Sequence, residues 1–272
     1  MTPPRLVILY GIGGLSDVGR HAIRAALDAG VEHIRVLTQH PELLELPNWK
    51  CSCPQPHTFS AEERKRLQVI PVKSWNEDGT VQGSDDDAAP PLTSHFADAT
   101  AVISCLGNRQ PGWSEPELKQ GWVSHDGNAL VLRAMQQYGI RRVVVMTSVG
   151  IHEDYPPMEF FAPGRWILSA MFAIPGVSRQ AYLDLTRMET LYQKSDETKI
   201  DYLLVRPVGL GDEVVPVGTW QLQKKKGVDV VGTNMAKLDC ARFMVEQALQ
   251  PTLHRTAVVI GNVVPEEKEG SK

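Results

Sequence analysis

The chain has 272 residues, of which 42% are hydrophobic, and it carries a net charge of −4 with an isoelectric point near 6.1. This length and apolar content are enough to bury one large core. The acidic balance, with no basic stripe along the chain, argues against nucleic acid as a main partner.

Cysteine content and hydropathy indicate the compartment. The four cysteines are too few and too scattered for a disulfide framework, so a reducing environment is expected. The longest apolar run, residues 166–177, falls short of the roughly 20 residues that a membrane-spanning helix needs. The first expected strand begins within five residues of the start, which leaves no space for a secretory signal. We therefore expect a soluble, cytoplasmic protein with no membrane partner.

A glycine-rich turn follows the first expected strand. The apolar residues 5–10 run directly into a G-x-x-G-x-x-x-x-G spacing formed by Gly11, Gly14 and Gly19, and an amphipathic helix is expected over residues 18–29. This order suits a dinucleotide, because glycines let the backbone approach a pyrophosphate and the helix N-terminus offers free N–H groups. The alternative is that the glycines only shape the turn of a structural strand–helix unit.

Strands and helices alternate along the rest of the chain. Further strands are expected over residues 33–38, 67–72, 101–107, 142–147, 202–205 and 257–260, and helices over residues 61–66, 122–138, 178–194 and 236–249. Continuous apolar strands that alternate with helices predict an α/β fold with a doubly wound, mostly parallel sheet covered on both faces. Pro71 places its strand toward a sheet edge or its own end.

The chain reads as one domain, because no repeat or linker divides it. We expect this domain to span residues 1–264, with loop insertions at about 47–66 and 76–91. Residues 265–272 form a charged tail.

Several segments occur in an order and spacing that point to a known family. They are Gly11 to Gly19, Ala101-Val-Ile-Ser-Cys-Leu-Gly107, Asp126-Gly-Asn-Ala-Leu130, Val143-Val-Val-Met-Thr-Ser148, Asp201-Tyr-Leu-Leu-Val-Arg-Pro207 and Lys237-Leu-Asp-Cys-Ala-Arg-Phe-Met244. Together they resemble the atypical short-chain dehydrogenase/reductase family, in its NmrA-like and biliverdin/flavin-reductase-like branch. The resemblance implies a Rossmann fold that binds NAD(P) across the carboxyl ends of its strands. The glycine loop is two residues longer than is usual in this branch.

The resemblance also implies the cofactor contacts. They are Gly11, Ile12, Gly13, Gly14, Leu15, Ser16, Gly19, Thr38, Gln39, Leu106, Gly107, Asn108, Thr147 and Pro207. None of residues 33–41 is acidic, so no carboxylate there would repel a 2′-phosphate. Gln39 stands where NADP-dependent relatives carry arginine or lysine, so NADP is favoured only modestly over NAD.

The catalytic residues implied by the resemblance are Ser148 and Tyr182. In active short-chain dehydrogenases a Tyr-x-x-x-Lys pair works with a serine at the end of the fifth strand. Here Thr186 replaces the lysine, and Arg187 lies about 100° further round the helix. A tyrosine with an ordinary pKa near ~10 is a poor acid at neutral pH without a neighbouring cation. Tyr182 therefore either takes part in catalysis or only lines the cleft.

A segment rich in large apolar side chains, residues 158–174, lies between the fifth strand and the helix of Tyr182. In the family this stretch overhangs the nicotinamide end of the cleft, so we expect Phe161 or Trp166 to contact a flat apolar substrate. An ordinary core helix or a subunit contact is the alternative.

Other polar clusters predict no site. Cys51 and Cys53 with His57 fall short of the four ligands of a structural zinc, so no metal is expected. The lysines at 224–226 resemble a solvated hairpin tip more than a phosphate clamp.

These observations lead to two functional hypotheses. The first is an NADP-dependent oxidoreductase, with NAD possible as cofactor, that acts on a small carbonyl, quinone or flavin-like molecule. The second is a non-catalytic NADP(H)-sensing regulator of the NmrA-like type that binds a protein partner; a homodimer is also possible.

Overall fold

The computed structural model describes residues 3–11, 17–44, 59–75, 80–81, 91–107, 122–149, 151, 177–211, 218, 220–223, 231–232 and 234–263. The strands are β1 (Arg5–Tyr10), β2 (His33–Thr38), β3 (Leu67–Ser74), β4 (Thr80–Val81), β5 (Ala101–Cys105), β6 (Arg142–Met146), β7 (Asp201–Pro207), β8 (Gly209–Gly211), β9 (Trp220–Gln223), β10 (Asn234–Ala236) and β11 (Thr256–Asn262). The helices are α1 (Asp17–Asp28), α2 (Ala61–Lys65), α3 (Val123–Tyr138), α5 (Val177–Gln193) and α6 (Lys237–Leu249), with 3-10 turns η2 (Pro41–Leu44) and η3 (Leu92–Phe96).

A nine-stranded sheet of order β4-β3-β2-β1-β5-β6-β7-β11-β9 forms the centre of the described structure. Its inner pairs are parallel, and the outer strands β4 and β9 pair antiparallel with β3 and β11. The predicted doubly wound, mostly parallel sheet is therefore confirmed. Strands β8 and β10 form a separate parallel pair.

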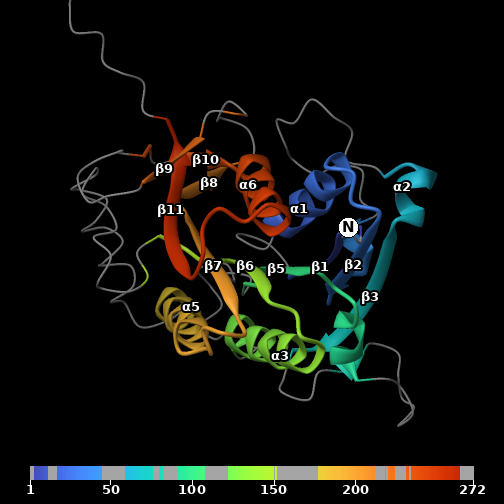
Figure 1. Cartoon of the computed structure of the whole chain (residues 1–272). Coiled ribbons are helices and arrows are strands. Elements are labelled where there is room, and N and C mark those ends of the chain that lie inside the picture. Colours follow the sequence, from blue (N-terminus) through green and yellow to red (C-terminus); the bar gives the residue numbers. More distant parts are fainter. Residues whose placement is uncertain are drawn as a thin grey trace, which may run out of the picture.

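Helices cover both faces of this sheet. Figure 1 shows α1 and α6 side by side on one face and α3 and α5 on the other. Successive residues of β1 serve the two layers in turn: Leu6, Ile8 and Tyr10 belong to the core under α1 and α6, whereas Val7 and Leu9 belong to the core under α3 and α5. This alternation follows from the two-residue repeat of a strand and explains why β1 is apolar throughout.

Two glycines end the helices that flank the first half of the sheet. After α1, the N–H of Gly30 bonds to the carbonyl of Leu27 and that of Val31 to Ala26, while Gly30 has a φ of 80°. This is the Schellman arrangement, whose left-handed residue is least strained as glycine. Gly139, with a φ of 70°, follows α3, which ends at Tyr138 as the sequence predicted.

The structure differs from the sequence-based expectations mainly in its short strands. The expected loop at 76–91 contains β4, which pairs with β3 only at Val72 and Ser74. Pro71 was expected at a sheet edge or at the end of its strand, but it lies inside β3. There it is opposite Thr38 of β2 and comes one residue before Val72, where the pairing with β4 begins. Strands β8, β9 and β10 were not predicted, because segments of three or four residues carry too little periodicity to be recognised.

The described residues include neither a membrane-spanning helix nor a metal-binding cluster. None of the helices in these parts of the chain is long and apolar enough to cross a membrane. The same residues contain no group of three histidine, cysteine, aspartate or glutamate side chains that could hold a metal ion.

Candidate functional site

The order of the strands defines where a ligand would bind. From β1 the chain proceeds outward through β2 to β3, and later runs from β5 on the other side of β1 through β6 to β7. The direction of winding thus reverses between β1 and β5. In open parallel sheets the crevice at such a reversal, outside the carboxyl ends of the strands, is where ligands bind.

Strand register brings five predicted regions to this one edge. Tyr10, the last residue of β1, pairs with Thr38 of β2 and with Cys105 of β5. Gly11, Gln39 and Leu106, which come next along their strands, therefore lie at the carboxyl edge. Met146 pairs with Val205, so the segments that follow β6 and β7 reach the same edge. Thr147 and Ser148 follow β6, Pro207 is the last residue of β7, and Gly107 follows Leu106 after β5, so these predicted site residues all lie at this edge.

Several predicted residues lie outside the described parts of the chain. They are Ile12, Gly13, Gly14, Leu15, Ser16, Asn108, Phe161 and Trp166 of the predicted site, together with Cys51, Cys53, His57 and the lysines at 224–226. The predictions for them stand as predictions.

Gly19 lies in the first turns of α1, where the helix meets the sheet. A Cβ at this position would be 2.3 Å from the Cβ of Tyr10 and 3.2 Å from that of Cys105. Only a glycine allows this approach, which is the helix–strand packing role of the third glycine in dinucleotide-binding turns. The close packing aims the N-terminus of α1 at the end of β1, and this geometry suits a pyrophosphate.

The end of β2 is a compact turn. The N–H of His40 donates to Thr38 Oγ1 over 3.0 Å, and Gln39 Nε2 donates to the carbonyl oxygen of Lys73 over 3.1 Å. His40 Nδ1 lies 3.0 Å from Glu42 Oε1. The pKa of Glu42 is lowered, first by a hydrogen bond from the backbone N–H of Glu42 to its own carboxylate and then by the contact with His40. Sequence reasoning stopped at residue 41 and so missed this carboxylate.

A buried polar network lies behind the end of β6. Thr147 Oγ1 donates to Glu189 Oε1 on α5 over 2.7 Å. Arg206 of β7 donates to the same carboxylate through Nε to Oε1 over 3.0 Å and through Nη2 to Oε2 over 2.5 Å. The Glu189 side chain is 0% exposed and that of Arg206 3%. Since an ion pair this deep costs much desolvation, its main consequence is to position α5 against the ends of β6 and β7.

Helix α5 also carries the predicted catalytic tyrosine. Tyr182 is half-buried, and the guanidinium carbon of Arg179 lies 5.5 Å from the centre of its ring. Arg187 instead stacks on Trp122 at 4.0 Å, so it does not replace the family's lysine. Thr186 Oγ1 is buried and has no hydrogen-bond partner within the described residues. The Ser148 hydroxyl donates to the carbonyl oxygen of Val149 over 3.2 Å.

Asp184 connects α5 with α3. Its carboxylate accepts the backbone N–H groups of Ser124, over 3.0 Å, and of His125, over 2.8 Å. These groups begin α3, where the residue at the cap, Trp122, supplies no side-chain hydrogen bond. Burial raises the pKa of Asp184, while the two N–H bonds oppose that rise. Asp184 thus caps α3 from α5, the helix that carries Tyr182.

Sequence reasoning missed Asp184, Glu189 and Arg206. A signal existed for the two acids: both fall on the side of α5 that carries the apolar residues Leu185, Met188 and Tyr192, which are buried. An acid within an apolar helical stripe indicates a buried polar partner. Glu189 lies 42 residues from its partner Thr147, and Asp184 lies 60 residues from its partner Ser124. The pattern along the helix alone therefore does not identify these partners.

This geometry defines a class: an α/β protein with a doubly wound sheet whose strand order reverses between β1 and β5. The chain belongs to the NAD(P)H-binding family, which matches residues 59–251. Membership establishes that the family binds NAD(P)H and leaves the branch within the family open. The comparison with curated protein sequences gave no match.

Solved structures resemble this chain over nearly its whole length. A protein provisionally named an epimerase, from Bacteroides thetaiotaomicron, has a TM-score of 0.60 at 19% identity and covers 97% of this chain and 100% of its own. A short-chain dehydrogenase/reductase from Veillonella parvula has a TM-score of 0.60 at 15% identity, with 96% and 95% covered. A Rossmann-fold NAD(P)-binding protein from Shigella flexneri has a TM-score of 0.56 at 17% identity, with 98% and 97% covered. At these identities the likeness shows the fold alone.

Proposed function

We propose that this protein is an NAD(P)H-dependent oxidoreductase, with NADP favoured, that reduces a small carbonyl, quinone or flavin-like substrate. The observation that carries the proposal is the 2.7 Å bond from Thr147 to Glu189. It joins the segment of Ser148, at the end of β6, to the helix that carries Tyr182. This contact supports the proposal because it keeps the segment of Ser148 and the helix of Tyr182 together beside the carboxyl edge, where we expect the cofactor.

The chain's own residues would bind and orient the reactants. The glycine-rich turn and the N-terminus of α1 would receive the pyrophosphate, with Gly11 at the end of β1 next to it. The bound cofactor supplies the hydride. Ser148 and Tyr182 would hold the substrate oxygen by hydrogen bonds, and Thr186 supplies no charge where the family carries a lysine. Catalysis would therefore depend mainly on positioning in a site that excludes water.

The preference for NADP rests on the turn after β2. The absence of an acid over residues 33–41 removes repulsion of a 2′-phosphate, but Gln39 adds no positive charge. We expect a margin on the order of 1–2 kcal/mol in favour of NADP. Fluorescence titration with NADPH and NADH measures it, and Gln39→Arg should widen it. Tighter binding of NADH by the unmodified protein would contradict the preference.

The reductase assignment is tested by turnover. Purified protein is incubated with NADPH and a panel of quinones, flavins and aldehydes, and the consumption of NADPH is followed by absorbance. We expect turnover with at least one flat or carbonyl-bearing compound. Gly14→Asp, which places a carboxylate in the expected phosphate loop, should abolish both cofactor binding and turnover. Cofactor binding without turnover of any compound would instead support a regulator, as the threonine at position 186 would favour.

The expected substrate contact is tested separately. Trp166→Ala should weaken binding of the substrate identified in that panel and leave NADPH affinity nearly unchanged, because the residue is expected over the nicotinamide end only. A variant that changes only the sedimentation behaviour would show that residues 158–174 form a subunit contact.

A further inference from the structure

A cavity lies at the amino ends of β1, β2 and β3, at the opposite edge of the sheet from the cofactor crevice. Its walls include the first residue of each of these parallel strands, Arg5, His33 and Leu67. The cavity has a volume of about 160 Å³. Pockets for drug-sized ligands measure roughly 300–1,000 Å³, so this one fits a small molecule or a single chemical group.

The walls of the cavity are strongly basic. Half of the ten lining residues carry basic side chains, and none is acidic: the five are Arg5, His33, Arg35, Lys65 and Arg66. The whole chain has a net charge of −4, so the charge around this cavity has the opposite sign to the net charge of the protein. A concentration of one charge sign in a concave site attracts ligands of the opposite sign.

The nearby acids compensate only part of this charge. The Asp98 carboxylate pairs with Arg5, and its Oδ1 lies 2.8 Å from Arg35 Nη1, so one negative charge serves two arginines. The hydrogen bond from Arg35 lowers the pKa of Asp98. Lys65 contacts Glu62, but these side chains are 70% and 81% exposed, and such surface pairs are weak. Arg5 Nε is buried without a hydrogen-bond partner in the described structure.

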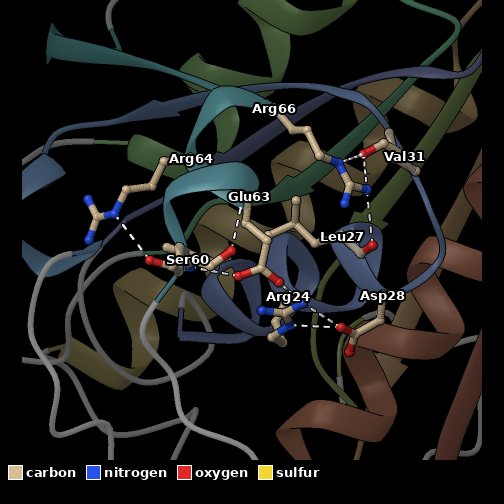
Figure 2. A network of polar contacts seen from close by, with 9 residues as sticks. Arg24, Leu27, Asp28, Val31, Ser60, Glu63, Arg64 and Arg66 are labelled. Carbon is tan, nitrogen blue, oxygen red and sulfur yellow. Dashed lines mark hydrogen bonds and ion pairs between the residues drawn. The ribbon is translucent and has the colours of Figure 1, made fainter.

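Arg66 is held in place by uncharged groups. Its Nε donates to the carbonyl oxygen of Val31 over 2.8 Å, and its Nη2 donates to that of Leu27 over 3.0 Å. Figure 2 shows this guanidinium directed at the C-terminal end of α1. Carbonyl oxygens fix the side chain without removing its charge. The entropy of ordering this arginine is therefore lost on folding, before any ligand arrives.

We propose that this cavity is a second ligand site, which binds a small phosphate group beside Arg5, Arg35 and Arg66. Arginine is the side chain best matched to phosphate, because its planar fork of donors bonds two oxygens at once. The aliphatic walls from Leu6, Ile34 and Leu67 would exclude water from part of the group. The site is independent of the cofactor crevice, because the two occupy opposite edges of one sheet.

Asp98 is the natural competitor of this anion. It occupies donors of two of the three arginines, and it has a φ of 62°. Asparagine tolerates this left-handed conformation as well as aspartate does. Asp98→Asn therefore removes the negative charge while it keeps the backbone, and it should strengthen phosphate binding.

The test is calorimetric titration of inorganic phosphate into the cofactor-free protein, with ionic strength held constant by sodium chloride. We expect a phosphate site whose affinity is lowered about tenfold or more in Arg35→Gln and raised in Asp98→Asn. The exposed Arg141, before β6, does not line the cavity, so Arg141→Gln serves as the matched control with unchanged affinity. Lys65→Gln, at an exposed position, should lower the affinity with little risk to folding.

Particular outcomes would overturn the proposal. Equal losses in Arg35→Gln and Arg141→Gln would show only non-specific attraction. An unchanged affinity in Asp98→Asn would show that the arginines beside it do not bind the anion. Because the glycine-rich loop is also expected to bind phosphate, the titration is repeated on Gly14→Asp. Binding that disappears there but persists in Arg35→Gln would assign the phosphate to the cofactor site instead.

Discussion

Gly19 is the residue at which α1 and the sheet come closest. The space for a Cβ is already occupied by Tyr10 and Cys105, both fully buried. Neither can move without disturbing the core, because interiors are packed as densely as organic crystals. The identity of this one residue therefore controls how closely α1 packs on β1 and β5.

Gly19→Ala should lower the free energy of unfolding by about 1–3 kcal/mol, because the added methyl group overpacks the interface between α1 and β1. Urea denaturation followed by circular dichroism measures the change. Gly211→Ala is the matched control, since a Cβ there meets no atom within 4 Å. An equal loss in both variants would show that the cost comes from glycine replacement in general.

Tyr182→Phe should lower reductase activity by less than tenfold, because the Tyr-x-x-x-Lys partner is a threonine here. The measurement is kcat with the substrate found in the panel, with NADPH affinity determined in parallel. A much larger loss with unchanged affinity would show that another cation activates the tyrosine. The contact of Arg179 with its ring makes Arg179→Gln the first variant to test in that case.

At the scale of elements, the short helix α2 is joined to α1 by charge. Glu63 Oε1 lies 2.5 Å from Arg24 Nη2, and Arg24 also contacts Asp28 within α1, as Figure 2 shows. Ser60 and Glu63 form a capping box at the start of α2. The hydrogen bond from Arg24, followed by that from the Ser60 backbone, lowers the pKa of Glu63 to about 2.

This pair should make stability depend on pH. The folded-state pKa of Glu63 lies below its ordinary value of 4.5, so its contribution is complete above about pH 4.5 and is lost as pH falls toward 2. Allowing for solvent screening, we expect Glu63→Gln to cost about 1 kcal/mol at pH 7 and progressively less below pH 4.5. Glutamine keeps the capping box, so the ion pair alone is tested.

Glu62→Gln is the control for the Glu63 experiment. Glu62 is 81% exposed, and in the described structure its ion pair is with Lys65, which is also exposed. The free energy of unfolding of both variants and of the unmodified protein is measured between pH 7 and pH 3. The difference from the unmodified protein should shrink as the pH falls for Glu63→Gln, and for Glu62→Gln it should stay small throughout. A constant difference from the unmodified protein across this range would argue against the ion pair.

The pair of Glu189 and Arg206 should behave as one unit. Arg206→Met leaves a buried carboxylate uncompensated and should cost about 3–5 kcal/mol of unfolding free energy. The double variant with Glu189→Met should lose less than the sum of the two single variants, as a thermodynamic cycle from urea denaturation would show. Additive losses would mean that the two side chains do not interact.

At the scale of the whole molecule, the two edges of the sheet differ in what they present. The carboxyl edge has glycine and hydroxyl-bearing residues at a switch point, and the amino edge of β1, β2 and β3 has a basic cavity. Each edge gathers its residues because the inner strands are parallel, which places the equivalent ends of all of them on the same side of the sheet. One sheet can therefore hold two ligands without contact between them.

Cofactor binding should stabilise the whole chain. At a concentration of one hundred times its dissociation constant, a ligand specific for the folded state adds about 2.7 kcal/mol. The midpoint of thermal unfolding should thus rise with NADPH, and rise less with NADH at the same concentration. Gly14→Asp should show neither shift. A rise of equal size in that variant would place the cofactor outside the glycine-rich loop.

The sequence by itself determined the type and order of the long elements. Residues 5–10 and 142–147 were recognisable as strands from continuous apolar runs, and the helix before Gly139 from its period and its ending. It also placed Gly19 and Thr147 among the site residues, through their position after strands and the resemblance to a family. These signals are local, so they survive in the linear chain.

Only the tertiary structure decided which distant residues meet. The reversal of strand order at β1 and β5, the bonds of Glu189 to Thr147 and Arg206, and the joining of Arg5, Arg35 and Asp98 all connect separate segments. No local pattern encodes such pairs, because they depend on how the sheet orders its strands and how closely the helices pack on it. Buried charge in particular becomes interpretable only when its partner is located, since burial without a partner is too costly to persist.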